Sequence, residues 1–237
     1  MTNPTMAIDQ RDPQLRAFAI LAQVARARGQ VYRWLALGFY PPDDEFVRAL
    51  QAGYGVREIE MATLWLGQDQ KRLQPSLVAI QSGTCSLNSL AQDFERRFGK
   101  SAERISLHES TYRWREASSL LASASDLARA LRQEYGQFGV TPMVGQEDKL
   151  PVEFEFMAFL CEHESNEWKN QASESARQLR RQERAFLEDH LVRWYPEFCW
   201  RVTQQSHGSF YSELARFADI WLKLEYGPGY TPARSKE

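Results

Sequence analysis

The sequence predicts an all-α protein, a single globular helical bundle of about 9–11 helices that carries two long functional loops. Apolar residues recur at spacings of three and four along most of the 237 residues, and no segment alternates with a period of two. Hydrophobic residues make up 43% of the chain and charged residues 25%, as in folded globular proteins. We expect a helical domain over residues 14–226, a flexible N-terminus over 1–13 and a flexible tail over 227–237.

The first expected helix is the longest, because its apolar period continues from Leu15 to Tyr40. Gly29 is a possible weak point within it, since glycine is a poor helix former. The pair Pro41-Pro42 then stops the helix. The two aspartates that follow, Asp43 and Asp44, can cap a short helix that runs to Leu50.

The rest of the chain continues this helical pattern. One or two helices are expected between Ile59 and Ile80, where Gly67 and Pro75 interrupt the period. The other expected helices are Leu87–Phe98, Ala117–Phe138, Lys149–Trp168, Ser173–Leu191, Trp194–Gln205 and Phe210–Tyr226. The helix Lys149–Trp168 is apolar around most of its circumference, which predicts a central position in the bundle.

Two long segments, residues 99–115 and 139–148, show no sustained period and contain residues that prefer irregular structure. Ordered loops of this length usually have a function. Because rigid helices flank both segments, we expect the two loops to form the functional face of the protein.

Charge and targeting signals exclude several classes of protein. A formal net charge of −2 provides no overall basic field that would attract nucleic acid. No apolar stretch is long enough to cross a membrane, and the N-terminus does not resemble a secretory signal. The three cysteines, Cys85, Cys161 and Cys199, are too few and too widely spaced for a disulfide framework. We therefore expect a cytoplasmic protein without stable membrane insertion.

The motifs of common enzyme classes are missing from the sequence, including the phosphate-binding glycine loop, the dinucleotide-binding glycine turn and the HExxH zinc pair. The residues closest to a metal cluster are Cys161 to Glu164, but adjacent residues on a helix point in different directions and cannot converge on one ion. We expect no cofactor, no metal and no catalytic residue. The enzyme alternative is a helical metal-dependent hydrolase built on His163, Glu164 and His190.

One segment resembles the signature of a known family. Residues 147–157, EDKLPVEFEFM, are similar to the signature of the TorD/DmsD/NarJ family of redox-enzyme maturation chaperones. Other blocks resemble the family in the expected order: LAQDFERRFG at 90–99, LHESTY at 107–112, FLEDHL at 186–191 with Trp194 and Pro196, and Phe210-Tyr211. The family has a histidine where this chain has Lys149, and a small residue where it has Pro151, so a fixed cation replaces a titratable imidazole here.

This resemblance implies an all-helical chaperone. Its partner would be the precursor of a molybdopterin-dependent oxidoreductase of the dimethyl sulfoxide reductase superfamily. The chaperone would bind this precursor by its twin-arginine signal peptide and assist cofactor insertion and assembly before export. The family includes monomers and helix-swapped dimers. A NarJ-like assembly chaperone whose client is not recognised through a signal peptide is the alternative.

A receptor for a twin-arginine peptide needs carboxylates for the guanidinium groups and aromatic walls for the apolar run that follows them. The expected carboxylates are Glu109, Glu147, Asp148 and Glu153, and the expected aromatic walls are Phe94, Phe98, Tyr112 and Phe156. The expected peptide-binding set also includes Arg97, Leu107, His108, Ser110, Gln146 and Lys149.

Structural roles are open for several of these residues. Asp148 precedes a helix, so its side chain can cap the amide of Leu150. Glu153 is either paired internally or faces a cleft. The phenylalanines are residues that often belong to a core.

Overall fold

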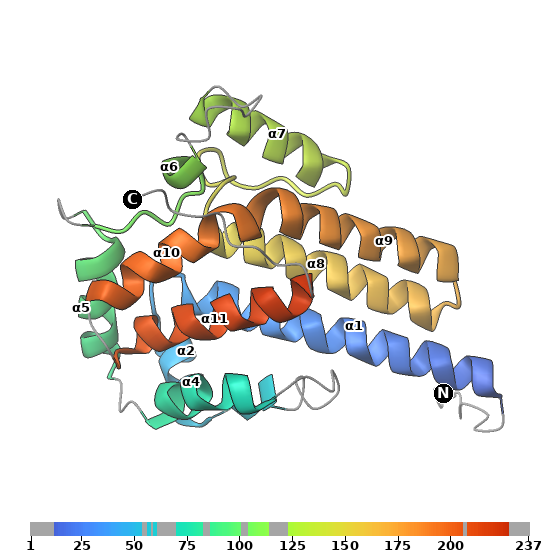
Figure 1. Ribbon diagram of the computed structural model, residues 1–237, viewed down its shortest axis with the longest axis horizontal. Coiled ribbons are helices and arrows are strands. Elements are labelled where there is room, and N and C mark those ends of the chain that lie inside the picture. The colour runs from blue at the N-terminus through green and yellow to red at the C-terminus, as the bar shows by residue number, and fades with distance from the viewer. Residues whose placement is uncertain are drawn as a thin grey trace, which may run out of the picture.

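The computed structural model describes residues 12–53, 56–57, 59–60, 70–82, 86–100, 104–113, 123–205 and 208–227. Within these ranges the chain is helical, and the only β pairing is an isolated bridge between His108 and Lys149, so the all-α prediction is confirmed. The helices are α1 Pro13–Gly38, α2 Asp44–Gln51, α4 Gln70–Ser82, α5 Leu87–Phe98, α6 Ser110–Arg113, α7 Ala124–Gly136, α8 Leu150–Lys169, α9 Ser173–Phe186, the π-helical turn η1 Leu187–Leu191, α10 Val192–Gln205 and α11 Phe210–Tyr226 (Figure 1).

The expected flexible ends lie almost entirely outside the described residues, as do Gly67 and residues 117–122 of the helix expected to begin at Ala117. Across the part of the chain that the structure describes, no helix is both long enough and apolar enough to cross a membrane.

Helix α8 is central, as its apolar composition predicts, and it packs between α1 and α9. Gly29 does not weaken α1, which runs through it without a break. A Cβ atom at this position would lie 3.2 Å from Cβ of Cys161 and 3.3 Å from the carbonyl oxygen of Ala158. The glycine therefore allows α1 and α8 to approach closely. The prediction that it weakens the helix is wrong, and its role is in helix packing.

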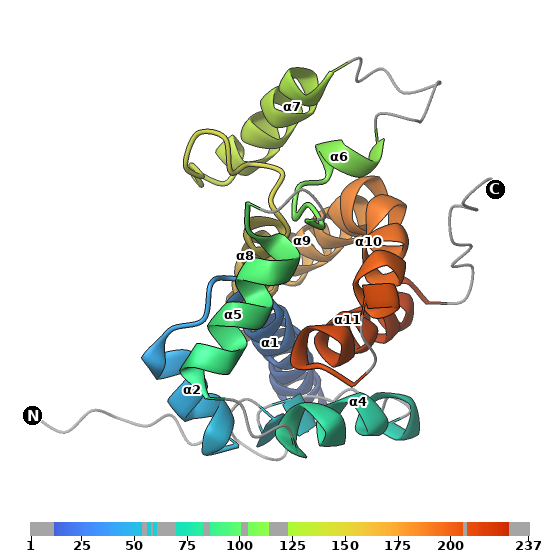
Figure 2. The ribbon, with the colours of Figure 1, turned by 90° about the vertical axis from the view of Figure 1, so that its left-hand side faces the viewer.

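Helix α11 runs antiparallel to α1 along the C-terminal half of α1. Trp34 stacks edge-on against Phe217 at 5.9 Å, and nearer the middle of α1 Tyr32 contacts Trp221 at the same distance. Helix α4 packs on α11, and Figures 1 and 2 show α2 and α4 on the side of the bundle opposite α6 and α7. The two expected loop segments are therefore on one side of a layered helical core.

Several helix ends follow the local sequence. Asp43 caps α2 by accepting a hydrogen bond from the amide of Phe46 at 2.8 Å. Ser86 begins α5 with a capping box that it forms with Ser89. Pro75, which was expected to interrupt a helix, lies inside α4.

The helices expected at Ser173–Leu191 and Trp194–Gln205 are joined without a loop. The π-helical turn η1 connects α9 directly to α10, and it contains His190, a buried residue. Single π-helical turns inside α-helices often occur at functional sites.

Candidate functional site

The two expected loops contact each other along their backbones. The amide of Glu109 donates to the carbonyl oxygen of Asp148 at 2.8 Å, and the amide of Leu150 donates to the carbonyl oxygen of Leu107 at 2.8 Å. Together these bonds frame the bridge between His108 and Lys149. We call residues 104–113 and 146–150 the loop junction.

Asp148 holds the two sides of the loop junction together through its side chain. Its carboxylate lies 2.8 Å from Nδ1 of His108 and accepts a hydrogen bond of 3.1 Å from the amide of Ser110. Burial alone would raise the pKa of Asp148, but these two hydrogen bonds lower it below its usual value. The prediction that Asp148 caps Leu150 is wrong, because that amide bonds to Leu107 and the N-cap residue of α8 is Lys149.

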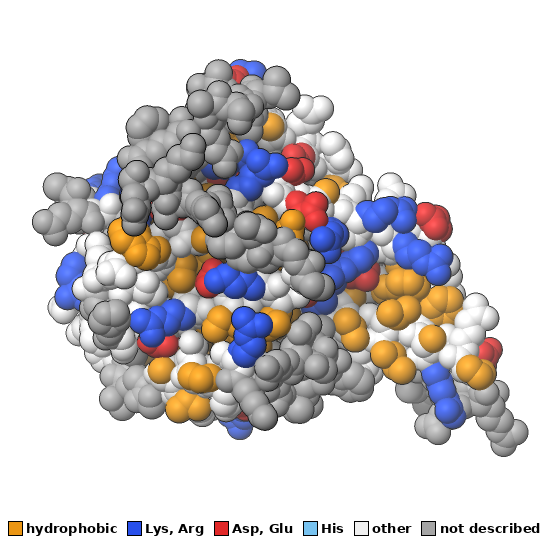
Figure 3. All heavy atoms as spheres, viewed as in Figure 1, with side chains coloured by type: hydrophobic (Ala, Val, Ile, Leu, Met, Phe, Trp, Pro, Cys, Tyr) orange, Lys and Arg blue, Asp and Glu red, His pale blue; other side chains and the backbone are white. Residues whose placement is uncertain are grey.

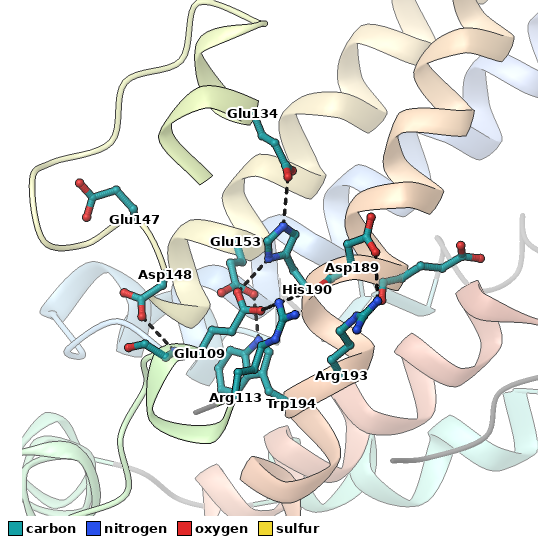
Figure 4. A network of polar contacts seen from close by, with 12 residues as sticks. Glu109, Arg113, Glu134, Glu147, Asp148, Glu153, Asp189, His190, Arg193 and Trp194 are labelled. Carbon is teal, nitrogen blue, oxygen red and sulfur yellow. Dashed lines mark hydrogen bonds and ion pairs between the residues drawn. The ribbon is translucent and has the colours of Figure 1, made fainter. Parts of the chain in front are cut away.

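Glu109 is the centre of a buried polar network beneath the loop junction. Its side chain is fully buried, accepts a hydrogen bond of 2.6 Å from Arg113 and lies 2.9 Å from Nδ1 of His190 (Figure 4). The other ring nitrogen of His190 lies 3.4 Å from Glu134 on α7. Burial disfavours the charged imidazolium, but the hydrogen bonds to Glu109 and Glu134 raise the pKa of His190 to about 9.

Glu153 completes this network from α8. Its side chain is fully buried and accepts a hydrogen bond of 3.2 Å from the indole of Trp194. Burial and the negative charge of Glu109 raise the pKa of Glu153 well above its usual value. Of the two positions expected for Glu153, paired within the protein or facing a cleft, the side chain takes the first.

Glu147 is also buried, with 1% of its surface exposed. Its carboxylate lies 2.8 Å from Nε of Arg132 on α7, and its backbone carbonyl oxygen accepts a hydrogen bond of 2.9 Å from the hydroxyl of Tyr135. The carboxylates of Glu109, Glu147, Asp148 and Glu153 thus lie inward and have partners within the chain. Together they tie the loops to the helices and do not form an open acidic surface.

Most of the predicted aromatic walls belong to the core. Phe94 and Phe98 contact each other and the ring of Tyr211 on α11. Arg97 is 1% exposed and donates to the carbonyl oxygen of Val202 at 3.3 Å and to the hydroxyl of Ser209 at 2.9 Å. These three predicted site residues fix α5 to α10 and α11.

Tyr112 lies at the edge of the loop junction. Its ring stacks on that of Trp194 at 5.2 Å, and its hydroxyl donates to the carbonyl oxygen of Ser106 at 2.7 Å. The guanidinium of Arg201 lies 5.2 Å from the centre of the same ring. The tyrosine thereby holds the loop against α10.

A pocket of about 460 Å³ opens beside the loop junction. Two predicted site residues, Gln146 and Phe156, line it. Glu155 stands at this pocket as an exposed carboxylate that accepts a hydrogen bond of 3.0 Å from the hydroxyl of Tyr40. The remaining lining residues are mostly apolar: Tyr135, Val140, Thr141, Pro142, Met143, Val152 and Phe159. The pocket is an apolar cavity with a negative charge at one side.

Sequence reasoning did not identify most of this pocket. The spacing of Val152, Glu155, Phe156 and Phe159 is that of one helix face, and this was the available signal. No local pattern could show that Tyr40, more than 100 residues away in the chain, contributes to the same cavity.

The three residues of the hydrolase alternative lie in separate environments. His163 is exposed and packs on the ring of Phe159, Glu164 pairs with Arg28, and His190 belongs to the Glu109 network. Among the described residues, no group of three or more histidine, cysteine or acidic side chains is placed to hold a metal ion.

Comparison with known protein families shows which family the chain belongs to. The family described as nitrate reductase delta subunit matches residues 66–200, more than half of the chain, and this range includes the whole loop junction and most of the pocket. A search of curated proteins found no match. The chain belongs to the nitrate reductase delta subunit family, a family of chaperones that act in molybdoenzyme maturation.

Proposed function

We propose that the protein binds the precursor of a molybdopterin-dependent oxidoreductase of the dimethyl sulfoxide reductase superfamily by its twin-arginine signal peptide. In this proposal the chaperone holds the peptide in the pocket beside the loop junction and assists cofactor insertion and assembly before export. The single observation that carries the proposal is the apolar pocket of about 460 Å³, which the family's signature segment helps to build.

The chemistry of the pocket suits such a peptide. A twin-arginine signal peptide presents two guanidinium groups followed by an apolar run, and the side chains of Val140, Met143 and Phe159 provide apolar surface for that run. Glu155 is the exposed acid of the pocket and can pair with a guanidinium. Burial and the nearby charge of Glu155 raise the pKa of Tyr40, so the tyrosine stays a neutral donor to this carboxylate.

The predicted peptide-binding residues then fall into two groups. Gln146 and Phe156 contact the peptide in the pocket, and the partly exposed His108, Ser110 and Lys149 extend the contact along the loop junction. The others act as positioning residues, which hold the loops in place: Phe94, Arg97, Phe98, Leu107, Glu109, Tyr112, Glu147, Asp148 and Glu153.

A matched pair of substitutions tests the pocket. Met143 lines it and is 79% exposed, whereas its neighbour Val144 is 87% exposed and is not part of the lining. We expect Met143→Glu to weaken binding of a fluorescein-labelled twin-arginine signal peptide by about tenfold or more, because a charge replaces buried apolar contact. Val144→Glu should leave the dissociation constant within about twofold of the wild-type value, as measured by fluorescence anisotropy.

Two further measurements separate this proposal from its alternatives. Glu155→Gln should reduce the preference for the twin-arginine peptide over one in which both arginines are replaced by leucine. A chaperone that recognises its client through the mature region would bind the mature client without its signal peptide. In that case the wild-type protein and the Met143→Glu variant would bind the signal peptide equally well. That second result would contradict the proposal.

A further inference from the structure

The N-terminal half of α1 carries an apolar stripe on its outer face. Ala17, Ile20, Leu21 and Val24 follow the spacing i, i+3, i+4 and i+7, which places them on one side of the helix. Ile20 is 55% exposed and Leu21 40% exposed. Figure 3 shows hydrophobic side chains gathered over this projecting end of the molecule. We call these four residues the α1 stripe.

The α1 stripe continues a face that α11 covers further along the helix. Positions 31, 35 and 38 of α1 repeat the direction of Ile20 and Val24, and a Cβ atom at Gly38 would lie 2.6 Å from Cδ2 of Leu214. Glu225, near the end of α11, pairs with Arg28 at 2.7 Å. Since α11 ends at Tyr226, no helix among the described residues lies over this face of α1 on the N-terminal side of Arg28.

A different face of this half of α1 is already occupied. Ala22 and Ala25 are buried against Trp168 of α8 and Ala176 of α9. The stripe is therefore a second apolar face, separate from the one that holds α1 in the bundle. It also lies at the other end of α1 from Tyr40 and the pocket.

Basic side chains flank the α1 stripe. Helix α1 has no aspartate or glutamate, and Arg16 precedes the first stripe residue. On the other side, Ala176 brings α9 against α1, and the next residue, Arg177, is exposed. Arg180, one turn further along α9, pairs with Glu183 at 2.9 Å. Arg180 also lies 3.6 Å from Glu225, at the place where α11 ends. Figure 3 shows basic side chains on both sides of the hydrophobic region.

We propose that the α1 stripe is a docking surface for an amphipathic helix of another protein, whose apolar face is bordered by carboxylates. Such a helix would continue the line of α11 along α1, with its acids next to Arg16 on one side and Arg177 on the other. A second copy of this chain fits poorly, because an antiparallel pairing of two α1 stripes brings arginines together and supplies no acid from α1. This surface is independent of the pocket proposed above for the signal peptide.

The test uses two designed helical peptides of about 18 residues, long enough for five turns. Both present leucine at positions i, i+3, i+4 and i+7 of each repeat; one has glutamate at the flanking positions and the other has lysine. Fluorescence anisotropy should show that the full-length protein binds the glutamate peptide about tenfold or more tightly than the lysine peptide at low salt.

Matched variants locate the binding. Ile20→Glu should weaken the glutamate peptide by about tenfold or more, whereas Leu37→Glu, on another face of the same helix and 48% exposed, should leave it unchanged. The double variant Arg16→Glu with Arg177→Glu should reverse the preference between the two peptides. Circular dichroism checks that all variants keep the helical content of the wild-type protein.

Other occupants would give different results, and each would overturn the proposal. Equal binding of both peptides, or equal loss with Ile20→Glu and Leu37→Glu, would show that the stripe does not select an acidic helix. Self-association that Ile20→Glu abolishes would identify a second copy as the occupant. Binding to vesicles of phosphatidylglycerol, lost with Ile20→Glu and without any preference between the peptides, would identify a membrane surface.

Discussion

Two clusters of buried charges hold this protein together, and they differ in the cation at their centre. In the Arg28 cluster, one guanidinium serves three carboxylates: it lies 2.9 Å from Glu164, 2.7 Å from Glu225 and in contact with Glu183. These residues come from α1, α8, α9 and α11, so the cluster joins four helices of the core. Arg28 itself is 3% exposed.

The Glu109 cluster, which consists of Glu109, Arg113, Glu134, Glu153 and His190, lies beneath the loop junction. Here an imidazole connects the loop to α7, because His190 lies between Glu109 and Glu134. A guanidinium stays charged at every pH at which proteins fold, whereas an imidazolium loses its proton within reach of ordinary buffers. Both clusters contain a guanidinium, Arg28 in one and Arg113 in the other, but only the Glu109 cluster also holds a cation that titrates. Part of the stability of the loop junction should therefore be lost when His190 loses its proton.

The largest expected effect comes from removing the permanent charge. Arg28→Ala removes the buried cation shared by the carboxyl groups of Glu164, Glu183 and Glu225, of which the last two also lie near the partly exposed Arg180. The loss should lower the free energy of unfolding by about 3–5 kcal/mol. Arg33→Ala is the control, because its ion pair with Glu162 is exposed and should contribute less than about 1 kcal/mol. Urea denaturation measures both. Equal losses in the two variants would show that the cluster does not stabilise the core.

A smaller effect is expected from the titrating cation. The pKa of His190 is about 9 in the folded protein, against 6.5 for an unperturbed histidine, so its stabilising contribution is complete below about pH 6.5 and is lost as the pH rises through 9. His190→Gln should cost about 2–3 kcal/mol at pH 6 and much less at pH 9. Urea denaturation at both pH values measures this difference.

Hydrogen exchange in the same variant distinguishes the two clusters. At pH 6, His190→Gln should increase exchange in the loop residues 104–113 and leave the amides of α1 and α8 near the Arg28 cluster protected. If exchange rose equally in both regions, the loops would not be a separately stabilised unit.

The smallest effect at neutral pH is expected from Glu183→Gln in the Arg28 cluster. Burial raises the pKa of Glu183 to about 8, with Arg28 opposing the change, so the folded protein keeps this proton where the unfolded chain has lost it. Stability should therefore fall as the pH rises from about 4.5 to 8. Glu183→Gln should alter the free energy of unfolding at pH 7 by about 1 kcal/mol or less. It should also reduce the fall in stability between about pH 4.5 and 8, which urea denaturation at several pH values would measure.

The helices were predictable because their signals are local. Helix α5 covers Leu87–Phe98 as its apolar period predicts, and α11 covers Phe210–Tyr226. The Pro41-Pro42 stop and the Asp43 cap also act within one or two turns. The join between α9 and α10 was not predictable in this way, because nothing in the local sequence distinguishes a π-helical turn from the end of a helix.

The candidate site was predictable only in part. The sequence located the two loops, and the tertiary structure brings them together through Glu109 and Asp148. The expected use of the four acids as an open acidic end of a groove does not match their burial, and for Glu153 the internally paired position was one of the two expected. The burial of a side chain depends on every segment that packs around it. One partner of the buried Glu109 is His190, which lies 81 residues later in the chain.

The sequence by itself determined that the chain is helical, where most helices begin and end, and which segments form the loops, since helix period, caps and proline stops act between neighbouring residues. The tertiary structure decided which acids are buried, where the apolar pocket opens and which face of α1 none of the described helices covers. Those features depend on contacts such as that between Arg28 and Glu225, 197 residues apart, and no local pattern contains them.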